Sequence, residues 1–341
     1  MKKWLVFVLV CLFMLTGCKD EVAVPPSEQQ GTGSEGQSES LDYKTPLSGQ
    51  AIAVQSTERP VVVTINNHPL ARPQSGLEQA DVVIELIAES SITRLLAVYQ
   101  IELPERVGPV RSARDYFINL AKGYHAFYVA HGYSPEAKQM LDAGVIDHVN
   151  GMQYDGTYFK RSSDRKAPHN SYTSGEAIEA AAEERGATLT LAASQMPSYS
   201  FSEDAQVAGS ATEVTIRYSN DANFTNVYSY DETTEQYTRS SGTTTTVDAE
   251  SGNPLELSNI VVVEVPHQTI DNEGRQALEL ESGGNAWLFR DGGMIQGTWK
   301  LDNGLIRLYT GNQEMTYKPG QTWMSIIPTA RGFQNMVTYT E

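Results

Sequence analysis

Residues 81–101, DVVIELIAESSITRLLAVYQI, set the architecture of this chain, because they hold two apolar runs with a short polar break between them. The runs cover 81–88 and 92–101 and are rich in the β-branched residues that favour strands. Glu89, Ser90 and Ser91 lie between them, so the stretch predicts a β-hairpin. A further β-branched run at 61–65, VVVTI, predicts a buried strand beside it.

Helical patterns follow this hairpin. We predict helices over 115–124, 135–143 and 174–185, with a short strand over 126–130 between the first two. Ser134 is suited to cap the second helix, since Pro135 and Glu136 follow it at positions that favour a helix start. The mixture predicts an α/β N-terminal domain over 51–190 with a mixed, partly antiparallel sheet.

The composition changes at 191–209, which is rich in serine and has little periodicity, and we interpret it as a linker. Beyond it, 210–341 is predicted to form a β-rich C-terminal domain. Residues 228–230 face 237–239 across a polar turn, and Asp291-Gly292 and Asn303-Gly304 are hairpin turn signals.

The chain begins with an export signal. Lys2 and Lys3 precede an apolar run over 4–14 that is too short to cross a bilayer of about 30 Å. Residues 15–18, Leu-Thr-Gly-Cys, resemble the bacterial lipobox, so we predict a signal peptide over 1–17 and attachment of lipid, with fatty acids such as palmitate, at Cys18. Residues 18–50 are predicted to be a lipidated, flexible tether that holds the protein extracytoplasmically on the outer face of the cell membrane.

Charge and cysteine content exclude several function classes. The formal net charge is −17, and it becomes −19 when Lys2 and Lys3 leave with the signal peptide. Such an acidic chain is not expected to bind nucleic acid, and its membrane contact should come from the N-terminal lipid alone. Cys11 leaves with the signal and Cys18 is consumed by lipid, which excludes thiol nucleophiles and thiolate zinc sites. We find no metal motif and predict no metal and no cofactor.

Several motifs together carry a resemblance to a known family. They are Asn66-Asn67-His68-Pro69, 71–77 (ARPQSGL), Glu85 with Glu89 and Thr93-Arg94, 108–114 (GPVRSAR), 167–170 (APHN), 289–292 (FRDG) and 297–299 (GTW). On these the chain resembles the YerB-like lipoproteins of Gram-positive bacteria, a family with a domain of unknown function. The resemblance implies an α/β N-terminal domain, a second C-terminal domain and a lipid anchor, and it implies no particular reaction. Ser90 and Ser91 depart from it, since glycines are expected in relatives.

Cations gather in the N-terminal half of this acidic chain. Arginine offers a planar fork of donors that suits carboxylate or phosphate, and the loop 108–114 ends just before a predicted helix. We therefore predict a site for an anionic ligand, although the same arginines would also serve as structural partners of nearby carboxylates. The candidate ligand-binding residues are Asn66, Asn67, Arg94, Arg111, Ser112, Arg114, His131, Arg161, His169 and Asn170.

Two residues are candidates for catalysis. Glu85 interrupts an apolar run, so it should be at least half buried and either pair with Arg94 or Arg111 or act as a general acid or base. Glu89 lies about 13 Å further along the strand, beyond the roughly 5 to 9.5 Å that separates paired glycosidase carboxylates. His131 follows an apolar strand and is a candidate base, with Ser134 either its nucleophile or a helix cap.

Three functions remain open from the sequence. The first is a binding module for an anionic cell-wall component, such as a stem-peptide carboxylate of peptidoglycan. The second is an accessory protein that docks on a cell-wall synthesis protein through its β-rich domain. The third is a wall-modifying hydrolase or transferase that uses Glu85 or His131.

Overall fold

The computed structural model describes residues 41–340. The predicted signal peptide, the lipid site at Cys18 and most of the predicted tether therefore lie outside the described residues. Within the described range, no helix is both long enough and apolar enough to cross a membrane.

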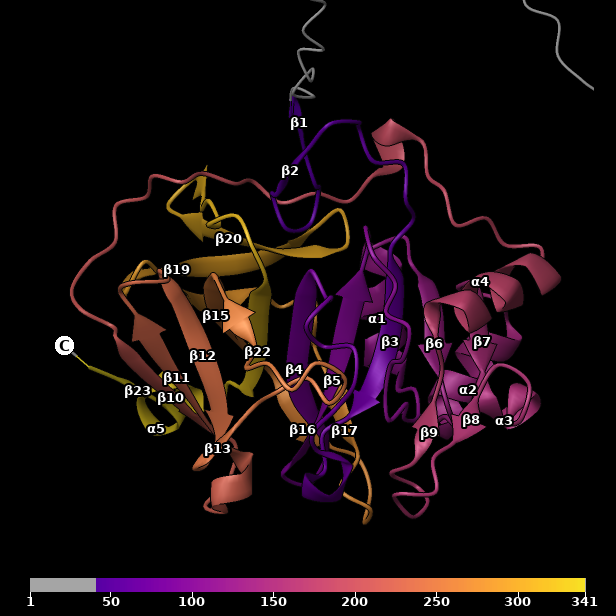
Figure 1. Ribbon diagram of the computed structural model, residues 1–341. Coiled ribbons are helices and arrows are strands. Elements are labelled where there is room, and N and C mark those ends of the chain that lie inside the picture. Colours follow the sequence, from indigo (N-terminus) through magenta and orange to yellow (C-terminus); the bar gives the residue numbers. More distant parts are fainter. Residues whose placement is uncertain (1–40, 341) are drawn as a thin grey trace, which may run out of the picture. The chain divides into compact units, whose positions relative to one another are not determined.

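One large mixed sheet organises the described residues (Figure 1). Its parallel pairs are β15 with β22, β22 with β4, β3 with β6 and β6 with β7, and its other pairs are antiparallel. Its eleven strands run in the order β21 (Gln313–Glu314), β20 (Leu305–Thr310), β19 (Gly293–Asp302), β18 (Gly284–Arg290), β15 (Asn259–Val265), β22 (Thr322–Pro328), β4 (Val82–Glu89), β5 (Ile92–Tyr99), β3 (Val61–Asn66), β6 (Phe127–Ala130) and β7 (His148–Asn150).

Both halves of the chain contribute to this sheet. Strand β22 comes from the C-terminal half and pairs along its length with β4 from the N-terminal half. The mixed sheet and the β-rich C-terminal half are as predicted, but the two predicted domains share one continuous sheet. Strands β15 and β22 are not among the elements predicted above, although their residues are buried throughout and their sequences, NIVVVEV and TWMSIIP, are typical of buried strands.

A smaller sheet covers one face of the large one. Val214 and Tyr228 of the small sheet pack in one buried cluster with Val83 and Trp323 of the large sheet. The small sheet runs β13 (Thr244–Thr245), β12 (Gln236–Ser241), β11 (Thr225–Asp231), β10 (Glu213–Arg217) and β23 (Val337–Tyr339), with β14 (Glu256–Leu257) also paired to β12.

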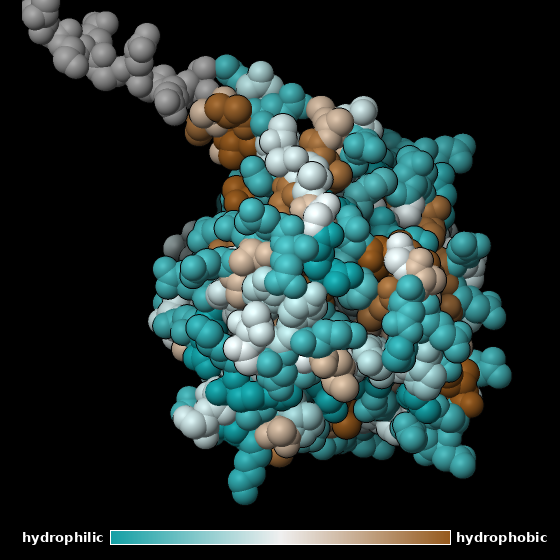
Figure 2. Space-filling view, turned by 90° about the vertical axis from the view of Figure 1, so that its right-hand side faces the viewer, coloured by the Kyte–Doolittle hydropathy of each residue, from teal (hydrophilic) through white to brown (hydrophobic). Residues whose placement is uncertain are grey.

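The predicted helices are present. Ser134 caps α2 by accepting the Ala137 N–H at 3.2 Å, which confirms its capping role. Buried residues of α1 and α2 pack on the opposite face of the large sheet from the small sheet, whereas α4 packs on the same face as the small sheet. Figure 2 shows the face at the α3 and α4 end, which is largely hydrophilic with scattered apolar residues. The helices are α1 (Asp115–Gly123), α2 (Pro135–Asp142), α3 (Gly151–Tyr154), α4 (Gly175–Glu184) and α5 (Gly332–Met336).

Short elements complete the described chain. They are the pairs β1 (Tyr43–Lys44) with β2 (Ala51–Ile52), β8 (Lys160–Arg161) with β9 (Ser171–Tyr172) and β16 (His267–Thr269) with β17 (Gln276–Leu278), and the 3-10 turns η1 (Pro69–Ala71), η2 (Ala193–Gln195) and η3 (Ala222–Phe224).

The predicted hairpins are confirmed. Strands β4 and β5 pair from Val82 opposite Val98 to Glu89 opposite Ile92, which leaves a two-residue turn. Ser90 in that turn has φ of 52°, a left-handed conformation that favours glycine, and this explains why glycine is expected there in relatives. Asp291 and Asn303 have φ of 52° and 50° at the other two predicted turns.

The predicted tether ends earlier than residue 50. Thr45, Leu47 and Ser48 are buried, and the Ser48 hydroxyl donates to an oxygen of Asp81 at 2.5 Å. Gly320 donates its N–H to the Ser48 carbonyl. Residues 45–48 therefore belong to the packed structure, and the prediction that the tether extends to residue 50 is wrong. The single apolar residue in this segment, Leu47, gave little sequence signal for its burial.

Glu85 links the two sheets. Its side chain points from β4 toward the small sheet and is 2% exposed. Its ion-pair partner is Arg239 of β12, not Arg94 or Arg111 as predicted. Oε1 accepts from Asn67 Nδ2 (3.1 Å) and Thr93 Oγ1 (2.8 Å), and Oε2 accepts from Asn226 Nδ2 (2.8 Å), Arg239 Nη2 (3.0 Å) and Trp323 Nε1 (3.1 Å).

Substitution Glu85→Met is expected to destabilise the protein by about 3–5 kcal/mol, because it leaves Arg239 buried without its counter-charge. The double variant Glu85→Met with Arg239→Met should recover most of that loss, since both charges are then gone. Urea unfolding followed by circular dichroism measures both effects. Lys138→Met, which breaks the exposed pair with Asp142, serves as the control and should change little. A double variant no more stable than the single one would contradict the assignment.

A second tight contact joins α1 to the β19–β20 turn. A Cβ atom at Gly123 would collide with the backbone of Gly304. Gly123→Ala is therefore expected to lower the free energy of unfolding by about 1–3 kcal/mol, through overpacking. Asn119→Ala, at an exposed position of the same helix, should be neutral or slightly stabilising. Equal unfolding midpoints for the two variants in urea would show that the contact is unimportant.

Candidate functional site

The predicted binding residues lie mainly at one edge of the large sheet. Strands β3, β6 and β7 are parallel, so their carboxyl ends meet at this edge, where ligands commonly bind in α/β folds. The loop 108–114 crosses it: the Arg111 N–H donates to the Thr64 carbonyl, and the Arg111 carbonyl accepts from the N–H of His131. Arg111 is thus held by its backbone between the ends of β3 and β6.

The Arg111 guanidinium is unpartnered. It is half-buried, and within residues 41–340 its side chain makes no hydrogen bond or ion pair. Burial lowers the pKa of Arg111, because the charged form loses water contacts that no carboxylate replaces. Arg111 therefore presents an uncompensated positive charge at the sheet edge.

Two stacked histidines lie near Arg111. The rings of His68 and His169 have centroids 4.6 Å apart and an interplanar angle of 24°. His68 Nδ1 accepts the Leu70 N–H at 3.1 Å, so in the neutral ring the proton is on Nε2. Asn66 Oδ1 accepts the His68 N–H at 3.0 Å, which directs Asn66 Nδ2 as a donor to His169 Nδ1 at 2.9 Å.

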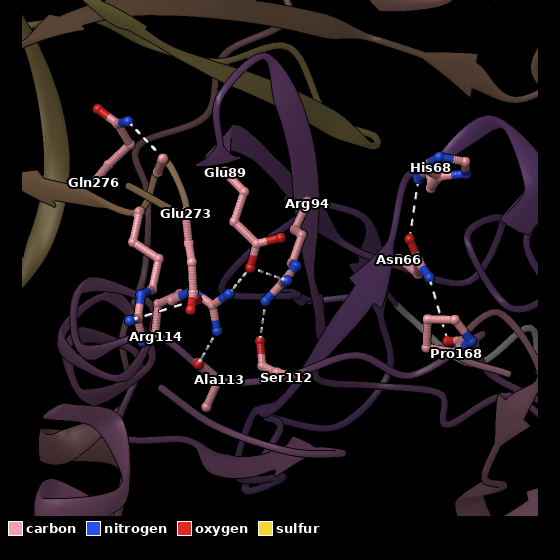
Figure 3. Close-up of polar contacts among 12 residues, drawn as sticks. Asn66, His68, Glu89, Arg94, Ser112, Ala113, Arg114, Pro168, Glu273 and Gln276 are labelled. Atoms are coloured by element: carbon pink, nitrogen blue, oxygen red, sulfur yellow. Dashed lines mark hydrogen bonds and ion pairs between the residues drawn. The ribbon is translucent and has the colours of Figure 1, made fainter. Parts of the chain in front are cut away.

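The Asn66 amide therefore fixes the His169 tautomer as well. Both rings carry the proton on Nε2, and neither Nε2–H has a hydrogen-bond partner in the described part of the chain. Figure 3 shows Asn66 between His68 and Pro168. The result is two N–H donors on stacked rings near one free cation, which is a donor set suited to an oxyanion.

Burial and positive neighbours lower the pKa of both histidines. Burial and then the charges of Arg72 and Arg111 lower the pKa of His68. Burial and then the charges of His68, Arg111 and Arg165 lower the pKa of His169. Within the part of the chain that the structure describes, no three His, Cys, Asp or Glu side chains are placed to share a metal ion.

Arg94 and Arg114 lie at the same edge but are already paired. Both donate to one oxygen of Glu89, and Figure 3 shows this carboxylate between the two guanidinium groups. Arg94 also donates to the Ser112 carbonyl at 2.7 Å, and the Ser112 hydroxyl donates to the His131 carbonyl at 3.2 Å. These contacts position the loop that carries Arg111. They agree with the alternative stated above, in which the arginines are structural partners of nearby carboxylates.

His131 does not have a free ring nitrogen. Arg161 Nη2 lies 2.9 Å from His131 Nε2, and because a guanidinium only donates, Nε2 must accept. The proton is therefore on Nδ1 and is donated to the Ser171 hydroxyl at 2.7 Å. Burial and the Arg161 charge lower the pKa of His131. Arg161 is also bound to Asp155 and to Asn170. This geometry does not support the predicted role of His131 as a general base.

Glu85 is equally unsuited to proton transfer. Its carboxylate is almost completely buried and accepts from the five donors described above. Two of these donors, Asn226 and Arg239, belong to the small sheet. This geometry does not support the predicted role of Glu85 as a general acid or base. It agrees with the structural alternative, a buried ion pair, with Arg239 as the partner.

Asn67 is a structural residue of this region. Its Nδ2 donates to Glu85 and Thr93, and its Oδ1 accepts from Arg72 Nε at 3.0 Å and from Gln74 Nε2 at 3.0 Å. Its amide has no capacity left for a ligand. The sequence analysis overlooked His68 as a candidate, although the Asn66-Asn67-His68-Pro69 motif contained it.

Comparisons with known proteins place the chain in a family. The models described as the N-terminal and the C-terminal domain of "Protein of unknown function (DUF3048)" match residues 47–188 and 214–324. A protein of Bacillus subtilis (strain 168) named "Putative lipoprotein YerB" is 42% identical over 333 residues, which cover 96% of each chain.

The fold agrees with a solved relative. The crystal structure of the YerB protein from Bacillus subtilis matches with a TM-score of 0.79 and 41% identity, over 88% of this chain and all of that one. These likenesses confirm the resemblance to the YerB-like lipoproteins. The chain therefore belongs to the DUF3048 family of proteins of unknown function.

Proposed function

We propose that this protein is an extracytoplasmic, membrane-anchored lipoprotein that binds an anionic component of the cell wall. The lipoprotein name of its relative supports the anchor, as do the charged and apolar start of the sequence and the lipobox-like residues 15–18. Processing of the signal peptide and acylation of Cys18 would place the folded part on the outer face of the membrane, next to the wall.

The observation that carries the binding role is the free Arg111 guanidinium with two Nε2–H donors beside it. A half-buried cation without a counter-ion is costly in the unliganded protein, and an oxyanion would supply the missing charge. A wall carboxylate, such as that of a peptidoglycan stem peptide, is an anion of the right kind. Because Glu85 and His131 are fully engaged, the geometry favours binding over proton-transfer chemistry.

The first test substitutes Arg111→Gln and measures the melting temperature with and without peptidoglycan fragments that carry free stem-peptide carboxylates. A ligand at a hundred times its Kd stabilises the native state by about 2.7 kcal/mol, so the wild type should melt a few degrees higher with the fragments. The variant should lose this shift. Fragments with amidated carboxylates are the matched ligand control.

Two further measurements separate binding from structure. Unliganded Arg111→Gln should be as stable as the wild type or more stable, because the substituted guanidinium has no partner in the described structure. Arg185→Gln removes an exposed cation and should keep the full ligand shift. The proposal fails if amidated fragments shift the wild type as strongly as the free acids, or if Arg111→Gln keeps the shift.

Binding should also depend on pH. The pKa values of His68 and His169 lie below the ordinary 6.5, so unliganded stability should fall as the pH drops from about 7.5 to about 5. A bound anion favours the protonated rings, so affinity should rise over the same interval while the carboxylate stays ionised. Calorimetric titration at several pH values measures this trend.

The double variant His68→Gln with His169→Gln isolates these two rings from the other titrating and charged groups nearby. Glutamine keeps a donor but does not titrate, so the pH dependence of affinity should flatten in the variant. Affinity that falls as the pH is lowered in the wild type would contradict the assignment of the two rings. The neighbouring groups that remain are Arg72, Arg94, Arg111, His131 and Arg165.

A further inference from the structure

A small cavity lies where the two halves of the chain meet, apart from the Arg111 site. Its volume is about 220 Å³. Pro69 and residues 72–74 of the N-terminal half line it, together with Asn223, parts of β12 and β13, and residues 246–247 of the C-terminal half. Ligand pockets for drug-sized molecules occupy roughly 300–1,000 Å³, so this one suits a smaller molecule.

The hydroxyl groups in this cavity are placed to donate. Arg239 Nη1 donates to Ser241 Oγ at 3.2 Å and to Thr246 Oγ1 at 2.7 Å. Since a guanidinium cannot accept, each hydroxyl must use its oxygen toward Arg239, and its own hydrogen stays free. Thr244 and Thr245 also line the cavity, and their hydroxyls have no partner among residues 41–340. The wall is therefore rich in hydrogen-bond donors.

The cavity also carries excess positive charge. Arg72 and Arg239 both line it, and no carboxylate does. Glu85 forms its ion pair with Arg239, whereas Glu85 and Asp221 act on Arg72 through charge attraction without an ion pair among the described residues. Arg72 donates to Asn67 Oδ1, to the Asn67 carbonyl and to the Asn223 carbonyl, all of them neutral acceptors. One N–H on each terminal nitrogen of Arg72 remains unused. Burial, and then the charge of Arg239, lowers the pKa of Arg72 to about 10, so it stays protonated at neutral pH.

One acceptor faces these donors. Gln74 is buried, and its Nε2 donates to the Asn66 carbonyl and to Asn67 Oδ1, which fixes the orientation of the amide. Its Oε1 has no partner within the described residues, and Gln74 lines the cavity. A ligand with its own hydroxyl group would satisfy this oxygen.

From these features we propose that the cavity binds a small hydroxycarboxylate, of the size of a single sugar acid. The carboxylate would face Arg72 and the free hydroxyl hydrogens, and a ligand hydroxyl would donate to Gln74 Oε1. Every group involved is part of the present fold, so the site needs no rearrangement. It involves none of the free donors of the Arg111 site and is independent of the function proposed for them.

Glucuronate and glucose form a matched pair of probes, since they differ in one carboxylate. Calorimetric titration of the protein should give saturable glucuronate binding with Kd below about 10 mM, and at least about tenfold weaker binding of glucose. Equal affinities would overturn the role of the charge. Absence of glucuronate binding in this range would overturn the site.

Variants locate the binding. Arg72→Gln should weaken glucuronate binding at least about tenfold through loss of a charge-assisted contact. Arg72 also holds Asn67, so a second variant that leaves this contact intact is needed, and Thr245→Val serves. The exposed Thr245 hydroxyl makes no hydrogen bond within the described residues. Its loss should weaken glucuronate binding about threefold or more without a change in melting temperature. Arg111→Gln should bind glucuronate as the wild type does. Loss of binding in Arg111→Gln with retention in Thr245→Val would place glucuronate at the other site and refute the proposal.

Discussion

The carboxylate of Glu85 is the interaction on which the rest of the structure depends. It is a charge within the otherwise apolar run 82–88 of β4, and it is stable there because five donors from both halves of the chain converge on it. Arg239 is buried for the same reason, because Glu85 balances its charge. Its guanidinium lies 4.3 Å from the Trp323 ring centroid. Each buried charge is tolerable only while the other is present, so the small sheet is held in one position over the large sheet.

This constraint also shapes the two candidate sites. Asn67 binds Glu85 on one side and Arg72 on the other. Of the adjacent residues, His68 stacks on His169, and Asn66 accepts the His68 N–H and donates to His169. The segment 66–72 therefore connects the buried ion pair, the donor-rich cavity and the Arg111 edge. A polar network of this kind is rigid because each group has a defined donor or acceptor role. Such rigidity favours binding sites that are formed before the ligand arrives.

The sequence predicted local features well and long-range partners poorly. The β4–β5 hairpin, the Asp291 and Asn303 turns and the Ser134 cap follow from neighbouring residues, whose preferences act over a few positions. Burial of Glu85 was likewise evident from its apolar neighbours. Its partner was not, because several arginines were available and only the pairing of β12 with the rest of the small sheet brings Arg239 opposite. Similarly, the motifs identified Arg111 and His169. That the Arg111 guanidinium lacks a partner, and that His169 carries its proton on Nε2, depend on residues distant in sequence and could not be predicted.

The position of β22 between β15 and β4 bears on how the chain reaches its native state. The strand at 322–328 follows every other strand of the large sheet in sequence, yet it lies at the centre of that sheet and pairs with strands that are synthesised before it. Until it arrives, β4 and β15 each have an unpaired edge, and unpaired edges promote aggregation. Folding is therefore expected to be slow and to finish only once nearly the whole polypeptide is available, as in other folds dominated by contacts between distant residues. The export proposed above would meet that condition, since a chain that crosses the membrane as an extended polymer would complete its sheet on the far side.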